Sequence, residues 1–177
     1  MSSYTGVMEL VRPSIRYKNS FLAAVPEMRS YTLNSSIDFD FAGNDFDAFV
    51  RTLNERTEGK GLPEGYVPDS IFWLVEGDEF IGDVRIRHRL NEHLLNVGGH
   101  IGYYICEAKR GKGYGKKILE LALSEAKRLG LDKVLLTCDE TNIASRKIIE
   151  KNGGILEDKR PNPDGGPDKL RFWIDLT

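Results

Sequence analysis

The chain has 177 residues, of which 40% are hydrophobic and 29% are charged, and its formal net charge is −2. This composition is typical of a globular protein with a core, and it excludes a disordered chain. The small net charge disfavours a nucleic-acid partner and an anionic membrane surface. No stretch approaches the roughly 20 apolar residues of a membrane span, and residues 1–8 lack the basic and apolar segments of a signal peptide. We therefore expect one cytoplasmic domain over residues 1–177.

The two cysteines, Cys106 and Cys138, are too few for a disulfide scaffold. No spacing of cysteine or histidine in the sequence matches a metal site. We expect both cysteines to be small buried side chains within strands, and we expect no metal.

The N-terminal part predicts a short strand over residues 9–11 and a helix that Ser14 caps and Pro26 ends or kinks. A segment rich in aspartate and phenylalanine follows over residues 32–47, and a second amphipathic helix is predicted over residues 45–57. The acidic side chains of this segment either attract a cationic acceptor or form a solvated face. They are Asp38, Asp40, Asp45 and Asp47.

The pattern then changes to strands. Apolar runs predict strands over residues 71–75 and 80–87, joined by a hairpin turn over residues 76–79. A connector over residues 91–96 leads to a third strand over residues 97–106. From there helices and strands alternate, which favours an α/β arrangement. The remaining predictions are helices over residues 116–129 and 142–152 and strands over residues 133–138, 155–158 and 170–176.

A glycine-rich turn over residues 110–116 connects the third strand to the next helix. Such a turn leaves backbone N–H groups without partners in front of the helix, where the helix dipole favours an anion. Gly113 and Gly115 have no Cβ, so we expect the backbone to approach a ligand closely there. The turn and its flank also carry positive charge. The basic side chains are Arg110, Lys112, Lys116 and Lys117. The turn therefore predicts a pyrophosphate site.

The spacing of this turn matches neither a Walker A loop nor a dinucleotide fingerprint, because the required glycines and Ser/Thr are missing. It matches Arg-x-x-Gly-x-Gly, and it resembles motif A of the GNAT acyltransferases, which holds the pyrophosphate of acetyl-CoA. Residues 142–153 resemble the second motif of that family. The order of predicted elements is similar to the whole GNAT fold. Phe72-Trp73 and the runs at 86–91 and 98–103 resemble an uncharacterised bacterial branch.

The resemblance implies an α/β (α+β) fold: a mixed, mostly antiparallel central sheet of about seven strands, with helices on both faces and one parallel pair splayed apart. It implies an acetyl-CoA-dependent N-acetyltransferase in which an amine of a small molecule or a peptide attacks the thioester directly. A non-catalytic acyl-CoA-binding sensor is the alternative. Relatives commonly form dimers through a sheet edge, so a homodimer is an expected assembly.

The resemblance also implies where acetyl-CoA binds. The pantetheine arm pairs with the free strand edge, the turn holds the pyrophosphate, and a backbone N–H near Ile105 binds the thioester oxygen. The implied cofactor-binding residues are Tyr104, Ile105, Cys106, Arg110, Gly111, Lys112, Gly113, Tyr114, Gly115, Lys116 and Asn142.

The acid that protonates the CoA thiolate departs from the family pattern. Many members carry a tyrosine about four residues before the glycine that closes the second-motif helix, and here that position is Ile149. Ser145 lies one turn earlier on the same face, and ribosomal-protein N-terminal acetyltransferases carry a serine in a similar helix. The resemblance thus implies Ser145 as the acid. A hydroxyl bonded back to its own helix, and protonation by solvent, are the alternatives.

For the base, relatives place a His or Glu on the strand before the turn, where this chain has His100, and imidazole titrates near neutral pH. Strand alternation puts His100 and Tyr103 on opposite faces, and either face could meet the cleft. Tyr103 is the third candidate catalytic residue. A structural role is the alternative for His100. His88 and Glu76 are further candidates, and we expect His93 on a loop surface.

Overall fold

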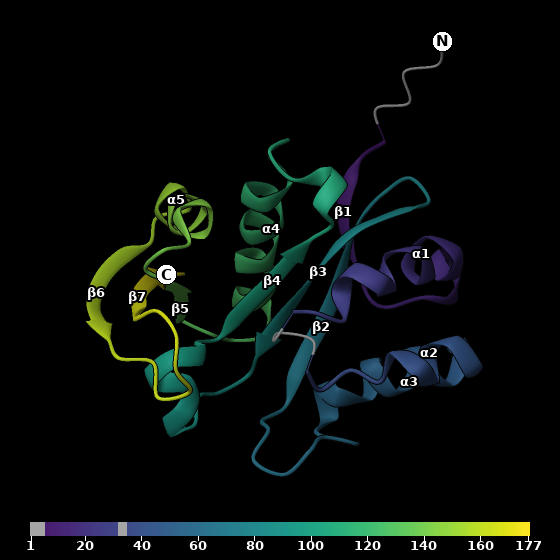
Figure 1. Cartoon of the computed structure of the whole chain (residues 1–177), viewed down its shortest axis with the longest axis horizontal. Coiled ribbons are helices and arrows are strands. Elements are labelled where there is room, and N and C mark those ends of the chain that lie inside the picture. The colour runs from purple at the N-terminus through teal and green to yellow at the C-terminus, as the bar shows by residue number, and fades with distance from the viewer. Residues whose placement is uncertain (1–5, 32–34) are drawn as a thin grey trace.

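The structure, a computed structural model, describes residues 6–31 and 35–177. Two groups of strands stand side by side, and α-helices lie on both faces of the group β1–β4 (Figure 1). The strands are β1 (Met8–Val11), β2 (Asp69–Glu76), β3 (Glu79–Arg87), β4 (Ile101–Ile105), β5 (Lys133–Asp139), β6 (Ile155–Arg160) and β7 (Lys169–Asp175). The α-helices are α1 (Lys18–Met28), α2 (Phe39–Asn44), α3 (Phe46–Glu55), α4 (Tyr114–Arg128) and α5 (Ile143–Lys151). Single turns are η1 (Ile15–Tyr17), η3 (Arg56–Glu58), η4 (Leu94–Gly98) and η5 (Glu107–Lys109).

The expected sheet is divided into two hydrogen-bonded parts. The first has the strand order β1-β2-β3-β4 and the second β5-β7-β6, and every pairing within them is antiparallel. In the described residues β4 and β5 form no ladder with each other. This is the splayed pair that we expected, and the α/β fold class is confirmed.

Two hydrophobic clusters hold the helices on opposite faces of the first sheet. One cluster joins α4 and α5 to both sheets and includes Leu119, Ile149 and Phe172. The other joins α1, α2 and α3 to the far face and is centred on Phe21 and Trp73, whose rings stack 4.6 Å apart. Apolar burial on both faces explains why β2 and β3 read as nearly continuous buried runs.

The gap between β4 and β5 is closed at one end by His100. Its backbone N–H donates to Leu135 O at 2.7 Å, and the Leu135 N–H donates to His100 Nδ1 at 2.9 Å. Gly99 adopts φ +67°, and a Cβ there would lie 2.5 Å from Leu135 O. Glycine is therefore required for the chain to pass so close to β5.

The predicted strand over residues 97–106 is wrong in its first part. Residues Leu94–Gly98 form a π-helical turn, and β4 begins only at Ile101. Gly98 at the end of η4 and Gly99 after it allow the backbone to change direction, which the apolar pattern did not reveal.

Two N-terminal predictions also change. Asp38 accepts a hydrogen bond from the Phe41 N–H and starts the short helix α2, within the segment for which we predicted no element. Helix α1 does not end at Pro26 but continues to Met28. No helix in residues 6–31 and 35–177 combines the length and apolarity that a bilayer crossing requires.

Candidate active site

The edge of β4 that faces β5 offers free backbone groups. Arg87 N–H donates to His100 O and Cys106 N–H donates to Ile81 O, so the residues that flank β4 on either side bond to β3. Residues in between alternate to the opposite edge. The N–H groups of Tyr103 and Ile105 therefore point into the gap.

The glycine-rich turn lies just beyond the end of β4. Gly111 and Gly113 have φ angles of +73° and +89°, and a Cβ on either would meet open space. The first bond of α4 runs from Lys117 N–H to Gly113 O at 3.1 Å. The N–H groups of Tyr114, Gly115 and Lys116 thus lack acceptors within the helix, which suits an anion.

The hairpin between β2 and β3 contacts this turn and its flanks through side chains. The Tyr114 hydroxyl donates to Glu76 Oε2 at 2.7 Å, and Lys109 pairs with Glu79 at 2.7 Å. The predicted approach of a ligand to Gly115 stays a prediction, and the structure gives this glycine a packing role as well. A Cβ there would lie 2.6 Å from Ile148 Cδ1, so this glycine permits α4 to pack against α5.

Two of the basic side chains point away from the turn. Arg110 donates from Nε to Ile105 O at 3.0 Å and from Nη2 to the Tyr31 hydroxyl. Its guanidinium also lies 5.7 Å from the centre of the Tyr104 ring. Lys112 donates to Ala108 O at 2.9 Å. Arg110 therefore links Tyr31, which follows α1, to the end of β4. Its expected contribution to the pyrophosphate site stays a prediction.

Two candidate catalytic residues lie together across the gap. The hydroxyl groups of Tyr103 and Ser145 are 3.0 Å apart, and Asn142 caps α5 by accepting from the Ser145 N–H at 3.0 Å. Asn142, expected at the CoA arm, thus holds the helix turn that carries Ser145. Burial raises the pKa of Tyr103 to about 12, so the phenol stays protonated at neutral pH.

The third candidate, His100, lies at the opposite end of β4 from the glycine-rich turn. Its Nδ1 lone pair is occupied by Leu135 N–H. Burial and then the charge of Arg87 lower the pKa of His100 to about 4. A buried imidazole with this bond supports the sheet junction, and it is poorly placed to remove a proton. The other two candidates are also engaged, His88 with Ser70 at 2.8 Å and Glu76 with Tyr114.

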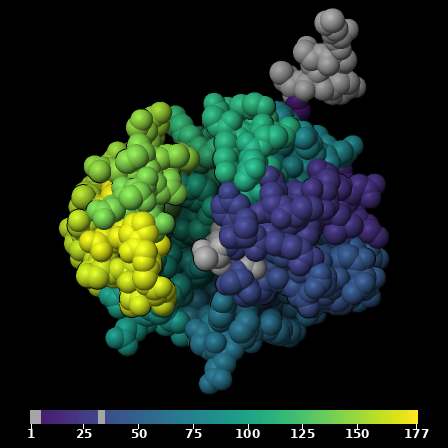
Figure 2. Space-filling view, viewed as in Figure 1, coloured from purple at the N-terminus to yellow at the C-terminus, as the bar shows by residue number. Residues whose placement is uncertain are grey.

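A cavity of about 640 Å³ reaches both strands that flank the gap. It touches Ile101 and Gly102 on β4 and Thr137 on β5. Its remaining walls come from Ser35 before α2, the loop after η3, one end each of β2, β3 and β7, the segment around η4, and the loop between β6 and β7. They are Ser35, Glu64, Gly65, Tyr66, Val67, Asp69, Arg87, Asn91, His93, Leu94, Val97, Gly98, Asn162, Asp164, Gly165 and Lys169. Figure 2 shows a hollow between the yellow-green C-terminal part and the purple and blue N-terminal helices.

Side chains from three strands hold η4 as one wall of this cavity. Their donors satisfy carbonyl groups that a short helical turn leaves free. The bonds are Arg171 Nε to Leu95 O at 3.0 Å, Thr137 Oγ1 to Val97 O at 2.7 Å, and Arg87 Nη1 to Gly98 O at 3.2 Å and Gly99 O at 3.0 Å.

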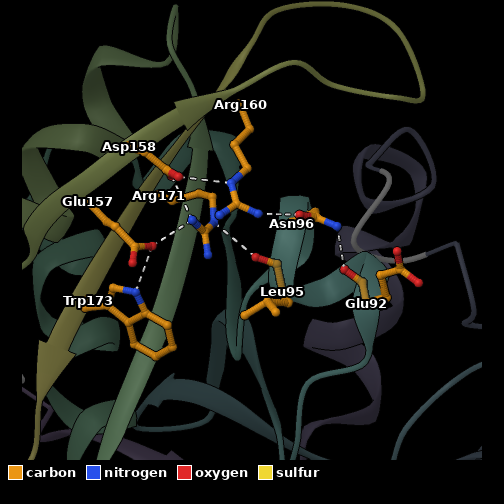
Figure 3. A network of polar contacts seen from close by, with 8 residues as sticks. All are labelled: Glu92, Leu95, Asn96, Glu157, Asp158, Arg160, Arg171 and Trp173. Carbon is orange, nitrogen blue, oxygen red and sulfur yellow. Dashed lines mark hydrogen bonds and ion pairs between the residues drawn. The ribbon is translucent and has the colours of Figure 1, made fainter.

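Arg171, buried on β7, is the centre of a larger polar network (Figure 3). The register of β6 slips between Leu156 and Asp158, so Glu157 is an extra residue, and both acids reach the same guanidinium. The contacts of the network are Arg171 with Glu157 at 2.6 Å and Asp158 at 2.7 Å, Trp173 with Glu157 at 3.0 Å, and Arg160 with Asp158 at 3.0 Å and with Asn96. The network ties the second sheet to η4.

Most side chains of the acidic segment have partners within the N-terminal helices, and their attraction of a cationic acceptor stays a prediction. Asp38 and Asp45 cap α2 and α3, and Asp40 pairs with Arg29 at 2.7 Å. None of these three residues, nor Asp47, lines the cavity.

Sequence reasoning missed the cavity residues His93, Arg87 and Thr137. His93 was expected on a loop surface, and it is exposed there but also lines the cavity. One feature of the sequence could have indicated Arg87. Alternation along β3 places Asp83, Arg85 and Arg87 on the same face, and three charged residues in a row are unusual on a buried face of a strand.

The chain matches the family model "Acetyltransferase (GNAT) domain" over residues 19–155. No curated protein sequence matches it significantly. The predicted extent of the domain, 1–177, and the expected homodimer and lack of a nucleic-acid partner stay predictions.

Three solved structures illustrate the likeness of the fold. Mycobacterium smegmatis RimJ in complex with CoA-disulfide has a TM-score of 0.68 and 18% identity, with 97% of this chain and 83% of RimJ covered. The Salmonella typhimurium acetyltransferase that modifies the N-terminal serine of ribosomal protein L7/L12 has a TM-score of 0.65 and 16% identity, with 98% and 96% covered. The microcin C7 self-immunity acetyltransferase MccE, in complex with acetyl-CoA and AMP, has a TM-score of 0.64 and 15% identity, with 97% and 96% covered.

Proposed function

Because the chain belongs to the GNAT family of acetyltransferases, which use acetyl-CoA as co-substrate, we propose that it acetylates the amino group of a peptide or protein in the cavity beside β4 and β5. The observation that carries the proposal is the meeting of two features at one gap. The free N–H groups of α4 lie at one end, and the cavity reaches both flanking strands at the other. An open cavity of about 640 Å³ suits a peptide end. The solved structures of similar fold include an enzyme for a ribosomal protein's N-terminal serine.

Acetyl-CoA, as co-substrate, would lie in the gap with its pyrophosphate at residues 111–116. The Ile105 N–H would donate to the thioester oxygen, which gains negative charge when the amine attacks. The amine nitrogen forms a bond to the carbonyl carbon, and the carbon–sulfur bond breaks. The leaving thiolate takes a proton from Ser145, which Tyr103 can replenish through their 3.0 Å hydrogen bond.

The attacking amine must also lose a proton. His100 is bonded to Leu135 and lies away from the turn, whereas His93 lines the cavity. We therefore assign the proton acceptor to His93 or to water in the open cavity. A His93→Asn variant distinguishes the two acceptors. Its kcat/KM should fall if His93 takes the proton and should stay unchanged if water does.

The test is CoA release from acetyl-CoA with a panel of peptide amides and small amines, followed by mass spectrometry of the product. We expect turnover on peptide amines, with acetylation at the α-amino group. Turnover on small amines alone would overturn the peptide assignment. Tight acetyl-CoA binding without turnover on any amine would support the sensor that we kept as the alternative.

A further inference from the structure

One carboxylate that lines the cavity, Asp69, is shared by two buried guanidinium groups that do not line it themselves. Arg56 binds Asp69 through two hydrogen bonds of 2.7 Å each, and Arg85 lies 3.6 Å from the same carboxylate. Asp69 thus neutralises one of the two charges. Arg87 follows on the same face of β3, and Asp83 is the other acid there.

Arg87 has no carboxylate partner among the described residues. Its Nη1 donates to two carbonyl groups of the cavity wall, Gly98 O and Gly99 O, and the nearby charge of Asp69 acts on it without direct contact. The side chain is half-buried and lines the cavity together with Asp69. Buried charges in proteins are normally paired, because an unpaired charge loses its hydration.

A further observation agrees with a missing anion at Arg87. Burial, and next the charge of Arg85, lower the pKa of Arg87 to about 10, so its charged form, which still prevails at neutral pH, is less favoured here than in water. A bound anion would relieve this cost.

The acidic residues of the cavity are placed differently. Glu64 and Asp164 are exposed on loops, whereas Arg87 lies deeper. An acceptor with an amine and an anionic group could therefore match opposite charges at two depths of the same cavity.

We propose that the acceptor carries an anionic group, a carboxylate or a phosphate, and that Arg87 binds it. This inference rests on the proposed function, since it concerns the acceptor of that reaction. Arg87 would then select among peptide ends, in addition to holding η4. Guanidinium groups suit both anions, because two parallel N–H groups match two oxygens.

The experiment compares Ser-x-Ala peptide amides in which x is glutamate, glutamine or phosphoserine. For the wild type we expect kcat/KM to be about tenfold or more higher with glutamate or phosphoserine than with glutamine. The glutamate and phosphoserine peptides show which anion is preferred. Arg87→Gln should remove the preference, and Arg87→Lys should retain part of it.

Two variants separate charge from wall structure. Arg89→Gln removes the same charge from an exposed position two residues later and should keep the preference. Thr137→Val loses the bond to Val97 O and so disturbs η4 without any change of charge. If it abolishes the preference as fully as Arg87→Gln does, Arg87 acts through the wall and the proposal is overturned.

Calorimetric binding of the glutamate and glutamine peptides to the CoA-bound protein supplies a second readout. Equal kcat/KM and equal affinity for the two peptides would overturn the anion site while leaving the proposed function intact. A preference in binding without any turnover would keep the anion site and reject the proposed function.

Discussion

The phenol oxygen of Tyr103 on β4 and the hydroxyl oxygen of Ser145 on α5 lie 3.0 Å apart. The strand and the helix are therefore joined across the gap by a hydrogen bond between side chains. This contact lies on the α4 and α5 face of the gap, where Tyr103 packs with the first core cluster. It places a chain of two hydroxyl groups beside the position where the thiolate would leave.

Ser145→Ala should lower kcat by about 10- to 100-fold and leave the affinity for acetyl-CoA unchanged, because it removes a proton donor and no cofactor contact. Tyr103→Phe should cause a smaller loss, since Ser145 can still be reprotonated by solvent. Stopped-flow detection of CoA thiol and calorimetry with acetyl-CoA measure the two quantities. Ser124→Ala on the exposed face of α4 is the control. Full kcat in Ser145→Ala would mean that solvent protonates the thiolate.

The second prediction concerns the side chains of the glycine-rich turn. Arg110→Lys should weaken acetyl-CoA binding. A lysine cannot donate to Ile105 O and to the Tyr31 hydroxyl at the same time, as the guanidinium does, and these two bonds position the end of β4. Tyr31→Phe removes only one of these contacts and should weaken binding less. Lys112→Gln should change affinity by less than about threefold, since its ammonium group lies on Ala108 O and is exposed.

Titration of acetyl-CoA at two salt concentrations distinguishes positioning from charge. If the two side chains act as free charges, Lys112→Gln will weaken binding as much as Arg110→Lys does, and the loss will shrink at high salt. That result would contradict a positioning role for Arg110. It would support our original expectation that Arg110 and Lys112 bind the pyrophosphate through their charge.

Short-range patterns predicted most elements of the fold because apolar periodicity and glycine turns are local. The hairpin at Glu76–Glu79 and the buried strand β5 followed from such patterns. The division into η4 and β4 did not, because it depends on Gly99 approaching Leu135, a contact between segments far apart in sequence. Residues such as Val97 fit a strand equally well until that contact is known.

The site shows the same limit. The order of residues 110–116 predicts free N–H groups, which are a backbone property. It does not predict the direction of a long side chain, and Arg110 turns toward Tyr31, about eighty positions away in the chain. For the same reason the sequence does not predict that Gly115 also makes room for Ile148 of α5.

The third prediction concerns two buried groups whose titrations oppose each other. Burial lowers the pKa of His100 from 6.5 to about 4, so between these values the unfolded state binds more protons and stability falls as pH falls. Burial raises the pKa of Asp83 from 3.8 to about 6, so in that window the folded state binds more protons and stability rises as pH falls. The two slopes nearly cancel between pH 4 and 6.

Asp83→Asn should therefore make the loss of stability toward pH 4 steeper than in the wild type, by about one proton in the linkage slope. His100→Gln should change the slope by a similar amount in the opposite direction. Urea unfolding at half-unit steps from pH 4 to 7 measures both. Parallel curves for the wild type and both variants would show that neither group titrates differently on folding.

The last prediction concerns the shared partners of Arg171. Because the bulge in β6 presents Glu157 and Asp158 to one guanidinium, either acid alone can compensate the buried charge. Glu157→Gln and Asp158→Asn should each destabilise the protein by about 1 kcal/mol or less. The double variant should cost about 3 kcal/mol, more than the sum, because it leaves a buried charge without a partner. Trp173→Phe, which loses one bond to Glu157, is the control. Additive losses in urea unfolding would show that the two acids act independently.

The double variant should also raise the KM for the acceptor and leave the affinity for acetyl-CoA unchanged. This is expected because Arg171 would release Leu95 O, and the η4 wall of the cavity would move.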